Sequence, residues 1–249
     1  MDGHVHVFDH RGSIERLPFT KQCIGFADID LSQPDKYTDM VSLYKKYIDM
    51  PGVIWMATGL DIDSIKAVYE AFPDKIHGFG ELKLYDDMRK TDKNRKSTRF
   101  LRSVCKFSAE HGNLPVYVHF ELNGPEDVIK FKSVAEAYPN VPLVLCHMGM
   151  NRFNHEFAYH AARELAILHT NIYLDLSWSG AKYLASNELS INQLPEGKCF
   201  WGSDYSPELM KLIDKQKAED FNKDELNKEF FVINKYIDSD QVLMRLFRI

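Results

Sequence analysis

The chain has 249 residues, of which 45% are hydrophobic and 27% are charged, and its formal net charge is −5. Such a composition is typical of one soluble globular domain, and we expect a single domain over residues 1–249. The negative net charge favours neither a nucleic acid nor a membrane as a partner, and the basic run at 89–106 is interpreted as a solvated loop and helix face. No apolar stretch reaches the about 20 residues of a membrane span, and no leader pattern precedes the first strand, so we expect a cytoplasmic protein.

Short β-rich runs alternate with longer helical patterns along the chain. Strands are predicted at Val5–Phe8, Cys23–Ala27 (the weakest pattern), Val53–Thr58, Ile76–Tyr85, Val116–Phe120, Leu143–Cys146, Ile172–Leu176 and Cys199–Gly202. The four cysteines form no CxxC pair, which indicates reduced thiols, and Cys146 and Cys199 are interpreted as small hydrophobes within strands.

Helices are predicted between these strands at Tyr37–Tyr47, Ser64–Phe72, Thr98–His111, Pro125–Tyr138, Glu156–His169 and Pro207–Lys217, with further helix in the tail at Asn222–Ile249. Ser64 is the expected N-cap of its helix, and Gly112 the expected residue after a helix end. In the tail, Phe230, Phe231, Ile233 and Ile237, together with Val242, Leu243 and Leu246, are expected to cover a barrel wall. Alternating strands and helices predict right-handed βαβ units, hence an α/β fold with a parallel eight-stranded sheet that closes as a (β/α)8 TIM barrel with extra C-terminal helices.

His4 and His6 lie two residues apart on the first predicted strand. Because side chains alternate along a strand, both imidazoles project to the same side and can grip one metal ion. Two imidazoles suit Zn, Fe, Ni or Mn better than Ca or Mg. The pair alone does not complete a site, so further ligands are needed.

Three more polar residues stand at the ends of apolar strands. His119 ends the run from Pro115, His147 ends the run from Pro142, and Asp204 ends the run from Cys199. Barrel enzymes place their active sites at the carboxyl ends of the strands, so these side chains are expected to meet there. A buried histidine can also be an ordinary hydrogen-bonded core residue, but five such groups together favour a metal centre.

The chain resembles the amidohydrolase superfamily, and within it the amidohydrolase-2-like branch. The motifs that carry the resemblance are Asp2-Gly-His-Val-His-Val, Val116-Tyr-Val-His119, Leu145-Cys-His-Met-Gly149, Asn171-Ile-Tyr-Leu-Asp-Leu-Ser177 and Phe200-Trp-Gly-Ser-Asp-Tyr205. The resemblance implies an eight-stranded barrel in which His4, His6, His119 and Asp204 surround a catalytic metal. It also implies that His147 binds a second metal or contacts the substrate.

The fourth predicted strand offers two candidates for one further ligand. Glu81 and Lys83 are two residues apart and face the same side, with Lys83 nearer the mouth. The stretch Gly78-Phe-Gly-Glu-Leu resembles TatD-like members, which use a glutamate here, so Glu81 is favoured. Lys83, carboxylated as in other members, is the competitor, and a plain Glu81–Lys83 ion pair is the third reading.

Hydrolysis by a metal-activated water is the default chemistry. One or two divalent ions, preferably Zn, would lower the pKa of bound water to about 7 and polarise an ester, lactone or amide carbonyl. Asp204 is the expected proton shuttle, and His147 is expected to stabilise the developing oxyanion. A small substrate is expected to meet side chains at or after the strand ends, namely Arg11, Lys83, Arg152, Trp178 and Tyr205.

Three other functions remain open from the sequence. A non-oxidative decarboxylase of an aromatic or unsaturated acid would use a similar set of ligands, but the resemblance implies no ligand on the fourth strand of such enzymes. A phosphoesterase is suggested by the TatD-like glutamate. A non-catalytic metal- or ligand-binding barrel has no need of Asp204 as a shuttle. A homo-oligomer is compatible with each of these functions.

Overall fold

The computed structural model describes residues 1–7, 22–27, 39–84, 93–151, 153–204 and 223–248. The described part contains an eight-stranded sheet with the order β1-β2-β3-β4-β5-β6-β7-β8, and every pair of neighbours that is hydrogen-bonded is parallel. The strands are β1 Asp2–Val7, β2 Cys23–Ala27, β3 Val53–Ala57, β4 Ile76–Lys83, β5 Val116–His119, β6 Leu143–Leu145, β7 Ile172–Leu176 and β8 Cys199–Trp201. All eight predicted strands are therefore confirmed, including the weak second one.

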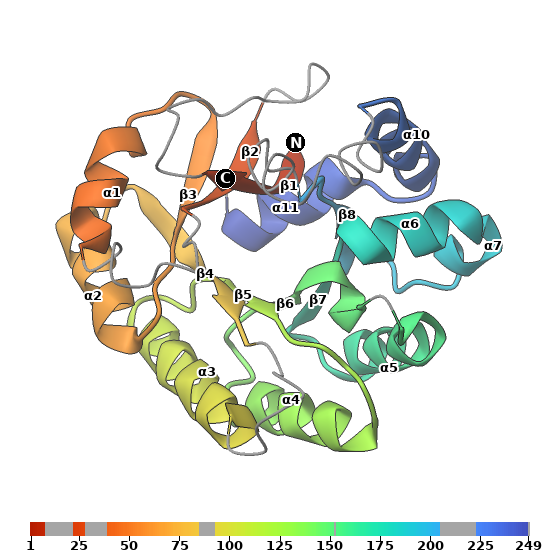
Figure 1. Cartoon of the computed structure of the whole chain (residues 1–249), viewed down its shortest axis with the longest axis horizontal. Coiled ribbons are helices and arrows are strands. Elements are labelled where there is room, and N and C mark those ends of the chain that lie inside the picture. Colours follow the sequence, from red (N-terminus) through yellow and green to blue (C-terminus); the bar gives the residue numbers. More distant parts are fainter. Residues whose placement is uncertain (8–21, 28–38, 85–92, 152, 205–222, 249) are drawn as a thin grey trace.

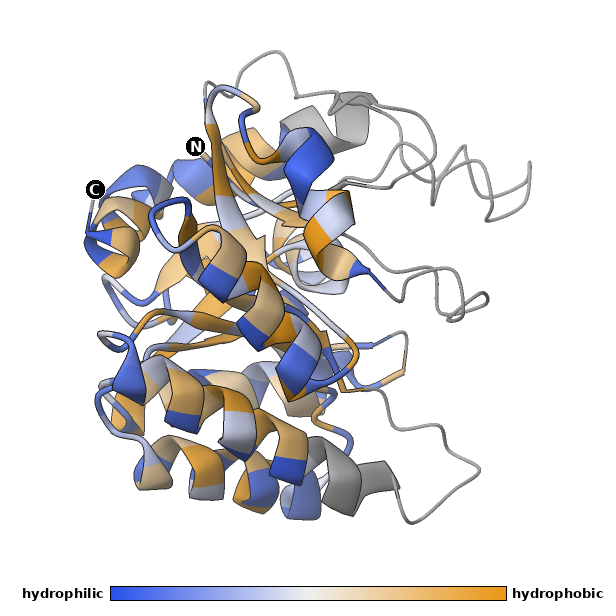
Figure 2. Cartoon of the chain, turned by 90° about the vertical axis from the view of Figure 1, so that its left-hand side faces the viewer, coloured by the Kyte–Doolittle hydropathy of each residue, from blue (hydrophilic) through white to orange (hydrophobic). Residues whose placement is uncertain are grey.

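The helices surround the strands on the outside (Figure 1). They are α1 Met40–Tyr47, α2 Ile62–Ala71, α3 Lys93–Glu110, α4 Pro125–Ala137, α5 His155–Leu168, α6 Trp178–Ser186, α7 Glu188–Ile191, α10 Lys223–Asn234 and α11 Ser239–Phe247, with a short 3-10 turn, η2, at Cys146–Gly149. Hydrophobic and hydrophilic residues lie on different sides of these helices (Figure 2), which lets one side pack against the sheet. No helix in the described ranges is long and apolar enough to cross a membrane. The TIM-barrel prediction is confirmed.

The predicted helix positions that lie within the described residues are largely right, with two differences. Asp61, not Ser64, caps α2: its side chain accepts a hydrogen bond from the Ser64 backbone N–H at 2.8 Å. The helices α6 and α7 were not predicted. The predicted helix Pro207–Lys217 lies outside the described residues, whereas Gly112 does end α3 with a φ of +86°.

The C-terminal helix closes the barrel interior from one end. Val242, Leu243, Leu246 and Phe247 of α11 pack in one cluster with inward residues of the strands, such as Tyr117. The Ser239 hydroxyl accepts a hydrogen bond from the Trp201 backbone N–H at 2.9 Å and so fixes α11 to β8. The expectation that Phe231 covers a wall is wrong, because its side chain is 65% exposed; Phe230 and Ile233 beside it do pack against the core.

A bulge in β4 changes which residues face the interior. Phe79 pairs with Val116 and Leu82 with Val118, so three steps along β4 match two steps along β5. The extra residue reverses the alternation of side chains: Leu82 belongs to the outer core, and Glu81 turns inward. Gly80 makes the bulge possible, because its φ is +115° and a Cβ there would lie 2.3 Å from the Tyr117 carbonyl oxygen.

Candidate metal centre

The candidate site is built around the carboxylate of Glu81 at the end of β4. Its Oε1 atom lies 3.1 Å from His119 Nδ1 at the end of β5 and 3.4 Å from His147 Nε2 in η2. All three side chains are buried, and one donor atom from each lies within 4.8 Å of the others. These residues come from three successive strand ends, as a parallel barrel requires.

His4 faces the same carboxylate from β1, and Asp204 lies against His4 and His147. His4 Nε2 lies 3.9 Å from Glu81 Oε2 and 3.5 Å from Asp204 Oδ1. The second oxygen of Asp204, Oδ2, lies 3.9 Å from His147 Nε2. The structure thus brings together five residues that the sequence singled out, and only Asp204 among them is more than marginally exposed to solvent.

Asp175 on β7 orients two of these histidines. Its Oδ2 atom lies 2.6 Å from His4 Nδ1 and accepts a hydrogen bond from the Ser177 hydroxyl at 2.7 Å. Because that hydroxyl donates its hydrogen to Asp175, it must accept the one from His147 Nδ1, which lies 2.7 Å away. Both imidazoles are therefore held by Nδ1, and their Nε2 atoms face the site. Orienting a histidine by a carboxylate behind it is typical of metal-binding histidines.

Two hydrogen bonds from backbone N–H groups hold β1 against the residues that follow β8, where the barrel closes. The Asp204 backbone N–H donates to the His4 carbonyl at 2.9 Å, and the Ser203 N–H donates to Asp2 Oδ1, also at 2.9 Å. Asp2 is buried, and desolvation raises its pKa to about 6 even though its hydrogen bonds with Ser203 and the His4 backbone N–H oppose the shift. The position of the His4 ring relative to the Asp204 side chain is thereby fixed through the backbone.

Several residues of the site adopt the left-handed backbone conformation although they are not glycines. The φ angles are +55° for His147, +56° for Met148, +42° for Trp178 and +53° for Asp204. Such conformations cost about 1–3 kcal/mol each and tend to cluster at functional sites. Here they accompany the turn of the His147 side chain toward Glu81 and of the Asp204 side chain toward His4 and His147, directly after their strands end.

The charges of the site perturb one another strongly. Burial disfavours the imidazolium of His4, but the neighbouring carboxylates of Asp175, Asp204 and Glu81 outweigh it and raise its pKa to about 10. The pKa of His147 is raised in the same way by Asp204 and Glu81, against its burial. Burial alone would raise the pKa of Glu81, yet hydrogen bonds with His119 and His147 hold it well below its usual value.

The remaining predicted site residues are only partly described. His6 belongs to β1, but its side chain is outside the described residues, as are Arg11, Arg152 and Tyr205 altogether. Lys83 is half-buried at the end of β4, in register with His119. Trp178 is half-buried at the start of α6, and its ring lies edge-on to His147 at 5.5 Å between centroids.

Sequence reasoning overlooked Asp175 and Ser177 as members of the site. Both stand in a motif that carries the family resemblance, but neither received a role. The sequence pattern that could have indicated them is Leu174-Asp-Leu-Ser177, in which polar and apolar residues alternate at the end of an otherwise apolar strand. This pattern places both side chains on the inner side, next to the histidines.

The donor set suits a divalent transition metal. Imidazole nitrogens and carboxylate oxygens are the ligands of catalytic zinc sites, and Glu81, His119 and His147 offer three such atoms in one buried cluster. The same donors serve Mn, Fe or Ni. The residues present therefore fit a bound divalent ion.

A parallel (β/α)8 barrel with histidines and carboxylates at its strand ends defines a class of metal-dependent barrel enzymes. The chain belongs to the amidohydrolase family, whose model matches residues 2–234.

Solved structures share the fold at low sequence identity. A zinc-bound amidohydrolase from Burkholderia multivorans has a TM-score of 0.65 and 15% identity, with 100% of this chain and 98% of that chain covered. A putative 2-pyrone-4,6-dicarboxylic acid hydrolase from Pseudomonas putida has a TM-score of 0.58 and 12% identity over 99% and 96%. A 2,6-dihydroxybenzoate decarboxylase from Rhizobium has a TM-score of 0.50 and 12% identity over 92% and 84%. No curated protein matches the sequence.

Proposed function

We propose that the chain is a metal-dependent hydrolase that acts on a small substrate with an ester, lactone or amide carbonyl. The observation that carries this proposal is the position of Glu81, whose Oε1 atom lies 3.1 Å from His119 and 3.4 Å from His147. A carboxylate between two histidines, opposite His4 and Asp204, makes a compact set of ligands for one or two divalent ions.

His4, His119 and Glu81 would hold the ion, with His6 as a further ligand. A divalent ion such as Zn²⁺ supplies a water of lowered pKa, near 7, and polarises the substrate carbonyl. Asp175 holds the His4 ring through Nδ1 so that Nε2 points into the site. We propose zinc as the preferred ion because the ligands are imidazole nitrogens and a carboxylate oxygen.

Asp204 is the group that moves the proton. Its carboxylate is the most exposed of the site, at 14% for the side chain, so it borders both the buried ligands and the space open to solvent. It accepts the proton of the attacking water and then donates it to the leaving group as the tetrahedral intermediate collapses. Its backbone N–H is fixed to His4, which keeps the carboxylate in place for both steps.

His147 and Trp178 are placed to contact the substrate. His147 is held by Ser177 at Nδ1, so its Nε2 atom can face the carbonyl oxygen as negative charge develops there or bind a second ion. The Trp178 ring packs edge-on against His147 and would form one wall of the substrate site. Arg11, Lys83, Arg152 and Tyr205 are proposed as the remaining substrate contacts.

Decarboxylation is the second candidate, because a decarboxylase shares the fold. The inward position of Glu81 favours hydrolysis, since the family resemblance implies no metal ligand on the fourth strand of decarboxylases. The experiment is to load the purified protein with Zn²⁺ or Mn²⁺ and to assay a panel of lactones, esters and amides, and separately hydroxybenzoates for release of carbon dioxide. Hydrolysis without carbon dioxide supports the proposal, and carbon dioxide release without hydrolysis overturns it.

A matched variant separates an enzyme from a binding protein. Asp204→Asn keeps the size of the side chain and removes the proton acceptor. We expect the variant to retain its metal and to lose about 10²- to 10⁴-fold in kcat, the usual contribution of a general acid and base. Unchanged turnover in a metal-replete variant would exclude Asp204 as the shuttle.

A further inference from the structure

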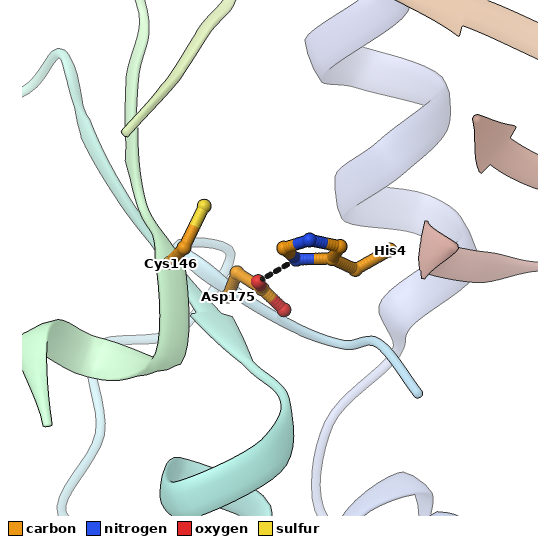
Figure 3. Close-up of side chains that lie close together, drawn as sticks. All are labelled: His4, Cys146 and Asp175. Carbon is orange, nitrogen blue, oxygen red and sulfur yellow. Dashed lines mark hydrogen bonds and ion pairs between the residues drawn. The ribbon is translucent and has the colours of Figure 1, made fainter. Parts of the chain in front are cut away.

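A second group of potential ligands lies beside the Glu81 centre. It consists of His4, Cys146 and Asp175, from β1, the start of η2 and β7, and one donor atom of each lies within 4.8 Å of the others. Figure 3 shows the three side chains beside one another, with the Asp175 carboxylate hydrogen-bonded to the His4 ring. All three residues are buried, and His4 is the member that also faces the Glu81 centre.

Half of the Asp175 carboxylate has no hydrogen-bond partner in the described part of the chain. The Oδ2 atom interacts with both His4 and Ser177, but the Oδ1 atom is buried without any such partner. Gly202 is close to Oδ1, because a Cβ built on it would lie 2.9 Å from that atom. As a glycine, it has no side chain that could donate a hydrogen bond to Oδ1. A buried carboxylate oxygen left in this way costs free energy unless a cation or a donor meets it.

The Cys146 thiol adds a soft donor to this group. It is buried, forms no disulfide and stands at the carboxyl end of a strand, where the active side of the barrel lies. Burial, together with the charges of Glu81, Asp175 and Asp204, raises the pKa of the Cys146 thiol well above its usual value. Ligation through this sulfur would replace the thiol proton, which would be released.

We propose that His4, Cys146 and Asp175 form a second ion site, which takes a thiophilic divalent ion such as Cd²⁺ or an additional Zn²⁺. The ion would bind a ring nitrogen of His4, the Cys146 sulfur as thiolate and a carboxylate oxygen of Asp175. The thiol proton and the proton on the binding nitrogen of the His4 imidazolium would both leave to solvent. Sulfur, imidazole and carboxylate in one cluster select such ions over Mg²⁺ or Ca²⁺.

The two sites depend on each other through His4. If the thiophilic ion takes Nε2, it uses the nitrogen that faces Glu81 and Asp204. If it takes Nδ1, it replaces the hydrogen bond to Asp175 that orients the ring. In either case an excess of thiophilic ion withdraws His4 from the Glu81 centre. The proposal needs no turnover, so a negative hydrolase assay leaves it standing.

The test uses Cd²⁺ as the probe and the full chain after removal of bound metal. Cd²⁺ is added both to the folded protein and during refolding, so that slow entry into the buried site does not obscure the result. X-ray absorption at the cadmium edge of the wild-type protein should show one sulfur neighbour, and the ultraviolet spectrum should show a thiolate-to-cadmium band. Coordination by nitrogen and oxygen alone under both loading conditions would overturn the proposal.

Three variants test the site, and the two cysteine variants among them assign the sulfur. Cys146→Ser should abolish the ultraviolet band, and Asp175→Asn should weaken Cd²⁺ binding by at least about tenfold. The matched control is Cys199→Ser, because Cys199 is also buried and without a disulfide but belongs to β8, outside the cluster; its band should equal that of the wild type. A band that persists in Cys146→Ser, or disappears in Cys199→Ser, would place the sulfur elsewhere and contradict the proposal.

Discussion

His4 Nδ1 lies 2.6 Å from Asp175 Oδ2, and both side chains are completely buried. This contact fixes the ring of His4, while Ser177 transmits the influence of the same carboxylate to His147. One aspartate on β7 therefore sets the orientation of two histidines that face Glu81.

The first prediction concerns this aspartate. Asp175→Asn should weaken metal binding by about 10- to 100-fold, the usual effect of removing a carboxylate behind a metal-binding histidine. Competition with a chromophoric chelator measures the affinity. Ser177→Ala, which affects only the His147 branch, is expected to have the smaller effect. Equal affinities in the wild type and Asp175→Asn would show that Asp175 does not orient the ligands.

The second prediction distinguishes the two candidates on β4. Glu81→Gln should reduce the metal content of the purified protein, because the charged oxygen between His119 and His147 is lost. Lys83→Met should leave the metal content unchanged. Elemental analysis of both variants decides between them, and the opposite pattern would make Lys83 the ligand.

The β4 bulge carries the third prediction. Gly80→Ala places a Cβ 2.3 Å from the Tyr117 carbonyl oxygen at a φ of +115°, so strain and overlap together should cost about 3 kcal/mol or more of unfolding free energy. Gly112→Ala is the control, since its φ is also positive but nothing lies within 4 Å of the added Cβ. That change should cost only about 1–2 kcal/mol. Equal losses in urea unfolding would mean that the close approach at Gly80 is unimportant.

The fourth prediction tests a buried hydroxyl. The Tyr117 hydroxyl has no hydrogen-bond partner among the described residues, and burial raises its pKa well above the usual value. Tyr117→Phe should therefore stabilise the protein by about 1 kcal/mol, because the buried group is no longer desolvated without compensation. Tyr159→Phe should instead destabilise it by about 0.5–1.5 kcal/mol, since the Tyr159 hydroxyl donates to the Ser190 carbonyl at 2.7 Å. If Tyr117→Phe instead lowered the thermal unfolding temperature, the Tyr117 hydroxyl would have to form a stabilising hydrogen bond, and the prediction would be wrong.

The strands and most helices could be predicted because each carries a local signal. Apolar runs that end in His119 or His147 mark both the strand and the side of the barrel where the polar group lies. The helix α6 was missed because Trp178–Ser186 contains Gly180 and two serines, which lower its helical propensity. Tertiary packing stabilises this helix instead. A Cβ at Gly180 would lie 3.2 Å from the His147 carbonyl oxygen, so the helix packs closely against η2.

The residues that face the site were harder to predict than the strands. Regular alternation on β4 would place Leu82 inside with Gly78 and Gly80, whereas the bulge brings Glu81 inside instead. Glu81 was favoured from the family resemblance, not from periodicity. Asp175 was missed because its partner, His4, is 171 positions away, and no local pattern states which ring a buried carboxylate will meet.

The most direct measurement is a crystal structure of the zinc-loaded protein with anomalous scattering at the zinc edge. We predict a peak bonded to Glu81 and His119, with His4 Nε2 as a further ligand at about 2.0–2.1 Å and the Asp204 carboxylate beside it. A zinc-loaded crystal without a peak among these residues, or with Glu81 turned away from it, would contradict the proposed metal centre.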